Sequence, residues 1–197
     1  DELKPKDFNE KIQQYIYSRF LKISKNNTLT VVEKTCANTL RPEFIYKLFP
    51  KAKYLFIYRN GYDCAISAKM KKKSRFNLIY LLKKLRYAPI NSIPYLIFKK
   101  INSKLWGPNY IGMQEDKEKL SDLELYSKQW MKCNQEVLNF LSSYPQANYK
   151  LINYEEFVNN PEIKMNEIFN FIQLQNKLNF TFKTDHIFVT SVGNSEK

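Results

Sequence analysis

Apolar residues recur along the chain with two different spacings, which separate expected helices from expected strands. Residues 8–23 carry apolar side chains three to four positions apart, as an amphipathic helix does. Residues 29–34 (LTVVEK) and 53–59 (KYLFIYR) are short continuous apolar runs that predict buried strands. Helices are predicted after each of these strands, at residues 42–49 and 62–73. The order strand, helix, strand, helix with short connections predicts a parallel α/β sheet.

The second half of the chain continues this pattern after an irregular stretch. Residues 76–118 contain helical pieces broken by prolines, and we expect them to form a helical insertion or lid over the site. The pattern then predicts a long amphipathic helix at 117–144, a third strand at 148–157 and a helix at 160–174. We see no internal repeat and no linker, so we expect a single domain over residues 1–197.

Charge narrows the possible partners without choosing one. The chain has 32 Lys and Arg against 19 Asp and Glu, a formal net charge of +13, which suits nucleic acid, an anionic membrane surface or a polyanionic small molecule. The longest apolar region, residues 76–98, carries three basic side chains and two prolines, so we expect no transmembrane span. Residues 1–11 have neither the basic start nor the apolar core of a signal peptide.

Cysteine and histidine usage argues against a metal centre. Cys36, Cys64 and Cys133 are isolated and form no CxxC pair, so neither a zinc site nor a disulfide framework is indicated. Reduced thiols indicate a cytoplasmic setting. The alternative is the Golgi or secretory lumen, where two Asn-X-Thr tripeptides would be glycosylation sites. The single histidine, His186, fits a structural role better than a catalytic one.

The end of the second predicted strand offers an arrangement for binding an anion. Ligands of open parallel sheets bind beyond the carboxyl ends of the strands, where helix N-termini present free N–H groups. Arg59 is predicted at such an end and Ser67 in the second turn of the next helix, so the two could clamp a phosphate. Asp63 would share a helical face with Ser67 and orient the arginine. The simpler interpretation gives these residues only strand-ending, capping and packing roles, and composition alone favours it.

The run from residue 31 to residue 67, VVEKTCANTLRPEFIYKLFPKAKYLFIYRNGYDCAIS, resembles the middle of PAPS-dependent sulfotransferases. Its last nine residues, RNGYDCAIS, look like the 3′-phosphate-binding motif of that family, which usually runs R-D-x-x-D-x-x-x-S. Residues 126–174 are similar to the family's Trp-containing helix, its strand ending in a Tyr-Glu pair and its NPE helix. The resemblance spans residues 29–174 and implies a three-layer parallel β-sheet flanked by helices, in the P-loop NTPase-like sulfotransferase fold.

The resemblance also implies an activity and a set of site residues. The family transfers a sulfuryl group from 3′-phosphoadenosine-5′-phosphosulfate (PAPS) to a hydroxyl or amine, leaves 3′,5′-phosphoadenosine (PAP), and uses no metal. By this resemblance Arg59 and Ser67 would hold the 3′-phosphate, and Tyr154 would lie near the nucleotide. Lys34 matches a lysine that approaches the transferred sulfonate, and the adjacent Glu33 is a candidate general base. Further nucleotide contacts are expected at Thr190, Ser191 and Gly193.

The sequence departs from the family at two points. Relatives carry an N-terminal phosphate loop rich in Gly, Ser and Thr, whereas the first glycine here, Gly61, already belongs to the 3′-phosphate motif. We therefore expect a chain that is incomplete at both ends, with the phosphate loop on a missing segment or on another chain. A non-catalytic relative is the alternative. Cys36 stands where cytosolic relatives have a histidine, so the base cannot be that residue.

Two other functional classes remain open. A basic groove formed by residues 69–75 with Lys83, Lys84 and Arg86 could bind a sulfated glycan or nucleic acid without chemistry, although nucleic acid is not the expected partner. A P-loop kinase relative is disfavoured because the sequence shows neither a Walker loop nor a magnesium-binding Asp at a strand end. The expected acceptor bears a hydroxyl on a glycan, a peptide or a small molecule, and the sequence does not choose among these.

Overall fold

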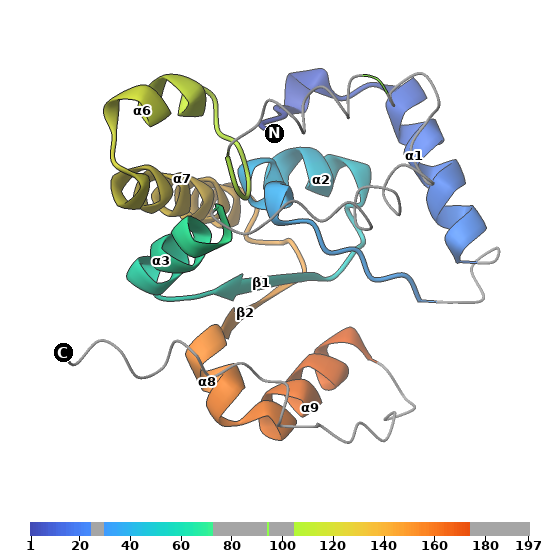
Figure 1. Ribbon diagram of the computed structural model, residues 1–197. Helices are drawn as coiled ribbons and strands as arrows, with labels where there is room; N and C mark the ends of the chain where they lie inside the picture. The colour runs from blue at the N-terminus through green and yellow to red at the C-terminus, as the bar shows by residue number, and fades with distance from the viewer. Residues whose placement is uncertain (25–29, 73–93, 95–104, 174–197) are drawn as a thin grey trace.

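The computed structural model describes residues 1–24, 30–72, 94 and 105–173 of the chain. These residues form a small parallel sheet of two strands surrounded by helices (Figure 1). The elements are η1 (Pro5–Asp7), α1 (Glu10–Ile23), η2 (Cys36–Leu40), α2 (Pro42–Leu48), β1 (Tyr54–Tyr58), α3 (Gly61–Lys72), α6 (Met113–Lys119), α7 (Asp122–Ser143), β2 (Tyr149–Asn153), α8 (Tyr154–Asn159) and α9 (Pro161–Ile172).

The two strands run parallel and end at the same edge of the sheet. Tyr54 pairs with Tyr149 at one end of the ladder, and Tyr58 pairs with Asn153 at the other. In Figure 1, α2, α3 and α7 lie above the strands, and α8 and α9 lie below them. Because each strand is followed directly by a helix, the starts of α3 and α8 lie close together at the carboxyl edge of the sheet.

The helices predicted at 8–23, 42–49, 62–73 and 160–174 and the strand predicted at 53–59 are confirmed as α1, α2, α3, α9 and β1. The parallel α/β character of the fold is confirmed in this smaller form, which is mostly helical.

The strand predicted at 29–34 is wrong for the part that the structure describes. Residues 30–34 form no strand, and the side chain of Val32 is 79% exposed. An apolar run is compatible with a strand, but a strand also needs a hydrogen-bonding neighbour, and the ladder among the described residues joins β1 to β2 and does not include residues 30–34. The described residues thus show two strands rather than the broader three-layer sheet that we expected.

The helix predicted at 117–144 is in fact two helices. α6 ends at Lys119, and Ser121 starts α7 with a capping box. The Ser121 hydroxyl accepts a hydrogen bond from the Glu124 amide at 3.4 Å, and the Glu124 carboxylate accepts one from the Ser121 amide at 2.9 Å. These two bonds satisfy amide groups that would otherwise lack partners, which explains why α7 begins here rather than at residue 117.

The third predicted strand, 148–157, is too long at its end. β2 stops at Asn153, whose side-chain oxygen accepts a hydrogen bond from the Glu156 amide at 2.8 Å and thereby caps α8. Tyr154 and the residues after it are therefore helical.

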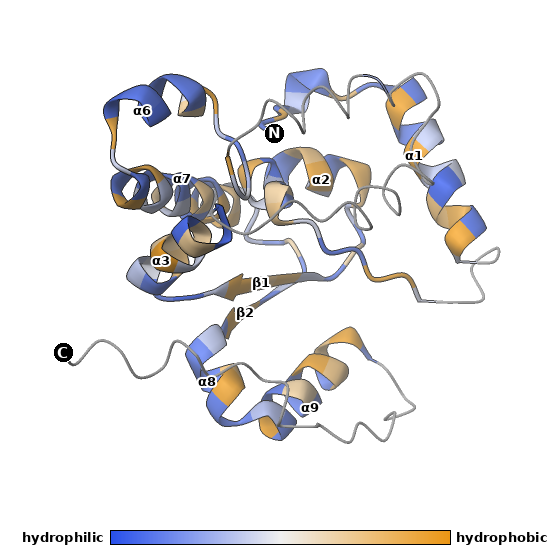
Figure 2. Ribbon diagram, viewed as in Figure 1, coloured by the Kyte–Doolittle hydropathy of each residue, from blue (hydrophilic) through white to orange (hydrophobic). Residues whose placement is uncertain are grey.

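The core lies where α3 packs on α7. Ala65 and Ala68 bring α3 close to α7, where Leu125 and Tyr126 are almost completely buried. A second cluster, of aromatic rings, fills the space between the sheet and helices α2 and α7, and Figure 2 shows the strands coloured as apolar. Its members are Tyr46, Tyr54, Phe56, Phe140, Tyr144 and Tyr149.

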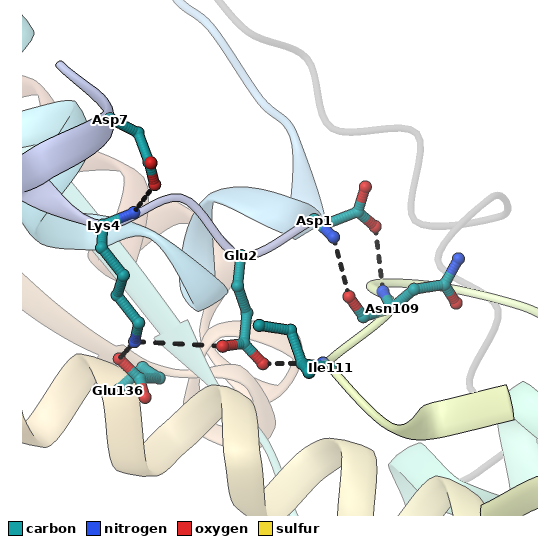
Figure 3. A network of polar contacts seen from close by, with 7 residues as sticks. All are labelled: Asp1, Glu2, Lys4, Asp7, Asn109, Ile111 and Glu136. Atoms are coloured by element: carbon teal, nitrogen blue, oxygen red, sulfur yellow. Dashed lines mark hydrogen bonds and ion pairs between the residues drawn. The ribbon is translucent and has the colours of Figure 1, made fainter. Parts of the chain in front are cut away.

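Polar contacts fasten the first residues of the chain to this core (Figure 3). The Glu2 carboxylate accepts a hydrogen bond from the Ile111 amide at 2.9 Å, and the Lys4 ammonium donates to the Glu136 carboxylate at 3.2 Å. Residues 1–7 thereby join the segment before α6 to the side of α7.

Most of the insertion or lid predicted at 76–118 lies outside the described residues, which here comprise residue 94 and residues 105–118, with most of α6. Among the helices that the structure describes, none combines the length and the apolar character that crossing a bilayer requires.

We predict that Ser121→Ala will lower the free energy of unfolding by about 1 kcal/mol, because it removes the hydroxyl half of the α7 capping box. Urea denaturation followed by circular dichroism measures the change. The matched control is Ser142→Ala, at an exposed position in the last turn of the same helix, where a change within about 0.5 kcal/mol is expected. Equal effects of the two substitutions would contradict the role of the capping box.

Candidate functional site

The turn between β1 and α3 consists of Arg59 and Asn60, and its own sequence explains how α3 begins at Gly61. The Asn60 side-chain oxygen accepts hydrogen bonds from the amides of Tyr62 at 3.0 Å and Asp63 at 3.3 Å. The Asn60 carbonyl accepts from the Cys64 amide at 3.1 Å, as the first bond of the helix. Asn60 is thus a helix N-cap, and it directs the start of α3 toward the carboxyl edge of the sheet.

The Arg59 side chain lies between an aromatic ring and a carboxylate. Its guanidinium carbon is 4.8 Å from the centre of the Tyr154 ring, and its Nη2 is 3.8 Å from Asp63 Oδ2. The arginine side chain is 19% exposed, so it is partly desolvated but still reachable from solvent. The structure therefore brings together three residues that the sequence singled out: Arg59 from the turn after β1, Asp63 from the first turn of α3 and Tyr154 from the start of α8.

The peptide group between Arg59 and Asn60 is held at both of its polar atoms. Its carbonyl, on Arg59, accepts a hydrogen bond from the Trp130 indole nitrogen at 3.1 Å. Its amide, on Asn60, donates to the Glu155 carboxylate at 2.8 Å. Trp130 comes from α7 and Glu155 from the first turn of α8, so two elements fix one peptide plane.

The same indole leaves little room for a side chain at Gly61. A Cβ atom added there would lie 3.0 Å from two carbons of the Trp130 ring, which is tighter than an ordinary van der Waals contact. The sequence pattern places Trp130 on the apolar side of its helix, and such a pattern does not indicate a bond to a strand end. The only sequence signal for Glu155 is its place in the Tyr-Glu pair.

Cys64, on α3, lies close enough to Arg59, Asp63 and Glu155 to interact with their charges. Burial raises the pKa of its thiol, and the positive charge of Arg59 offsets only part of that rise. The thiol is therefore protonated at neutral pH, and a protonated thiol is a poor nucleophile.

Ser67 is half-buried in the second turn of α3. It lies four residues after Asp63, which puts the two side chains on one helical face as the sequence predicted. Ser67 thus lies about one helical turn beyond Asp63, the residue that pairs with Arg59, on the same side of α3.

Lys34 and Glu33 make local contacts on the exposed segment before α2. The Lys34 ammonium donates to the Cys36 sulfur at 3.2 Å. The Glu33 carboxylate accepts hydrogen bonds from the Asn38 side chain at 2.7 Å and from the Thr35 hydroxyl. Within the described residues, the hydrogen bonds of both side chains remain near η2 and none joins them to the Arg59 turn.

The remaining site predictions lie elsewhere. Thr190, Ser191 and Gly193, together with His186, fall outside the described residues. In the part of the chain that the structure describes, no three His, Cys, Asp or Glu side chains gather as metal ligands would.

We predict that Gly61→Ala will destabilise the protein by about 1 kcal/mol, since the added methyl group presses on Trp130. The direction of the change in the free energy of unfolding is informative. Gly61 does not have a positive φ, so without a clash alanine would be favoured over glycine in this helix by up to about 1 kcal/mol. Urea denaturation of both proteins checks it. Repeating the comparison in a Trp130→Leu background is the control, where the cost should disappear. A cost that persists there would contradict the proposed clash.

A comparison with known families gives one match. Residues 2–85 match the model of the "Sulfotransferase family", a stretch that includes Lys34, Arg59 and Ser67 but not Trp130 or Tyr154. No curated protein and no solved structure matches the chain. The family match confirms the resemblance to sulfotransferases over this part of the chain and indicates transfer of sulfuryl groups as the general chemistry. Residues 2–85 are thus similar to the sulfotransferase family.

Proposed function

We propose that this protein transfers a sulfuryl group from PAPS to a hydroxyl or amine of an acceptor. The observation that supports the proposal most is the meeting of Arg59 with Tyr154. Both residues were expected at the nucleotide from separate parts of the sequence, and the parallel pairing of β1 with β2 puts the guanidinium 4.8 Å from the ring. The P-loop-like sheet of the family is part of the same proposal.

The chemistry of the donor groups fits a 3′-phosphate. A guanidinium in contact with an aromatic face still has N–H groups in its own plane, which can bind a phosphate bidentately. The N-terminus of the 12-residue helix α3 begins two residues after Arg59 and adds a favourable field, and Ser67 adds a hydroxyl donor. These groups come from one turn and one helix, so a single ligand could use all of them.

Asp63 is an anion that already pairs with the guanidinium and would compete with a phosphate for it. Its ion pair with Arg59 is 3.8 Å long, and both side chains are partly exposed. Such a pair contributes at most about 1 kcal/mol, whereas hydrogen bonds to charged groups contribute about 1.5 to 3 kcal/mol. A phosphate can therefore take over the guanidinium, while Asp63 keeps the arginine in place when no ligand is bound.

PAPS, when bound, supplies an activated sulfuryl group whose departure leaves negative charge on the 5′-phosphate. We assign the cation for that charge to Lys34, because fixed positive charges at a leaving group stabilise the transition state. Glu33 is the candidate base, held in place by Thr35 and Asn38. Arg59, Ser67 and Tyr154 bind and orient the opposite end of the nucleotide. Thr190, Ser191 and Gly193 are proposed as further nucleotide contacts.

We predict that the chain binds PAP, and that Arg59→Ala weakens this binding about 10- to 100-fold, because charge-assisted bonds to the 3′-phosphate are lost. Isothermal titration calorimetry with PAP measures the affinity. The matched control is Lys69→Ala, which removes one positive charge from an exposed position on the same helix and should leave the affinity within about twofold.

A comparison of ligands separates the proposal from a purely basic binding module. A wild-type chain that gives no heat with PAP, yet binds a sulfated glycan or RNA with a steep salt dependence, would overturn the proposal. Equal losses in Arg59→Ala and Lys69→Ala would also contradict it, because they would show an effect of net charge rather than of the Arg59 turn.

A further inference from the structure

We infer that Trp130 and Glu155 are positioning residues that hold the Arg59 side chain and the start of α3 in the relative orientation that binds the nucleotide. The inference rests on the proposed function, because it gives the Arg59 turn a ligand. Neither residue is placed against the nucleotide itself. Each acts on the peptide group that joins Arg59 to Asn60.

The two hydrogen bonds fix the plane of that peptide group. The indole of Trp130 binds its carbonyl at 3.1 Å, and the carboxylate of Glu155 binds its amide at 2.8 Å. The carbonyl and the amide of one peptide point in opposite directions, so the two bonds together oppose rotation about its long axis. In Figure 1, α7 and α8 lie on opposite sides of the strand end, which matches this two-sided hold.

The orientation of this peptide affects two parts of the proposed phosphate site, the Arg59 side chain and the N-terminus of α3. Rotating it changes the ψ angle of Arg59 and the φ angle of Asn60. The first angle sets how the chain after Arg59 is directed relative to the Arg59 side chain, and the second acts on Asn60, the N-cap that starts α3. A peptide free to rotate would therefore let the start of α3 change position relative to the guanidinium, so the two would no longer face one phosphate together.

Because Glu155 is negatively charged, a positioning role and a purely electrostatic role predict opposite changes in anion affinity when it is replaced by alanine. Glu155 binds the amide that follows Arg59, and a carboxylate there repels an incoming phosphate, so in the absence of a positioning role its removal should strengthen anion binding. Glutamine keeps an acceptor oxygen for the Asn60 amide and removes the charge, whereas alanine removes both. If Glu155 acts by positioning, alanine weakens binding and glutamine does not. A role in electrostatics alone would make both substitutions strengthen it.

Trp130 offers a second and independent pair of variants. Trp130→Phe keeps an aromatic ring against Gly61 but removes the indole N–H, so the Arg59 carbonyl loses this donor. Trp106→Phe is the matched control, because it is the same substitution at the other tryptophan of the chain, which is 42% exposed.

The experiment measures PAP affinity by calorimetry for the wild-type chain and the four variants, with urea denaturation to verify that each is folded. We expect Glu155→Ala and Trp130→Phe to weaken PAP binding about tenfold, and Glu155→Gln and Trp106→Phe to stay within about twofold of wild type. Amide hydrogen exchange at Asn60, measured by NMR without ligand, should become faster in Glu155→Ala and remain slow in Glu155→Gln. Where Trp130→Phe fails to fold, the Glu155 pair still decides.

The outcomes separate the two levels of the proposal. A wild-type chain that does not bind PAP overturns the proposed function. A wild-type chain that binds PAP, with Glu155→Ala binding equally well or better, overturns the positioning role and leaves the proposed function standing. Unchanged exchange at Asn60 in Glu155→Ala would likewise overturn the positioning role.

Discussion

The contact between the Trp130 indole and the turn after β1 joins the helical core to the sheet edge. The indole donates to the Arg59 carbonyl and packs where a side chain at position 61 would stand. Because Trp130 lies on α7, the position of this turn depends on how α7 packs against the rest of the molecule. The small residues Ala65 and Ala68 allow α3 to approach α7 closely and so make that contact possible.

The charged groups at the carboxyl edge of the sheet each contact a nearby partner. Arg59 faces the Tyr154 ring and the Asp63 carboxylate, and Glu155 binds the backbone beside it. A partly desolvated guanidinium with an aromatic face on one side can exchange a carboxylate for a phosphate at modest cost, since the existing ion pair is weak. The formal net charge of +13 supports the approach of an anionic ligand but does not say where it binds.

The sulfotransferase match and the site geometry complement each other. The matched stretch contains Arg59 and Ser67, whereas Tyr154, Trp130 and Glu155 come from the part of the chain beyond it. The structure brings the second group to the first through the β1–β2 pairing and the packing of α3 on α7. Lys34 stands apart on the exposed segment before α2, so the described residues build the 3′-phosphate side of the proposed site more fully than its reactive side.

The sequence by itself determined the features that arise from neighbouring residues: the periods of α1, α2 and α9, the apolar run of β1, and the spacing of Arg59, Asp63 and Ser67. Tertiary structure decided the features that need distant partners. The apolar run at 29–34 has the composition of a strand, yet its described part is exposed and unpaired because strand formation depends on hydrogen bonds from elsewhere in the chain. For the same reason, the contact of Arg59 with Tyr154 and the hold of Trp130 and Glu155 on one peptide follow only from the packing of elements far apart in sequence.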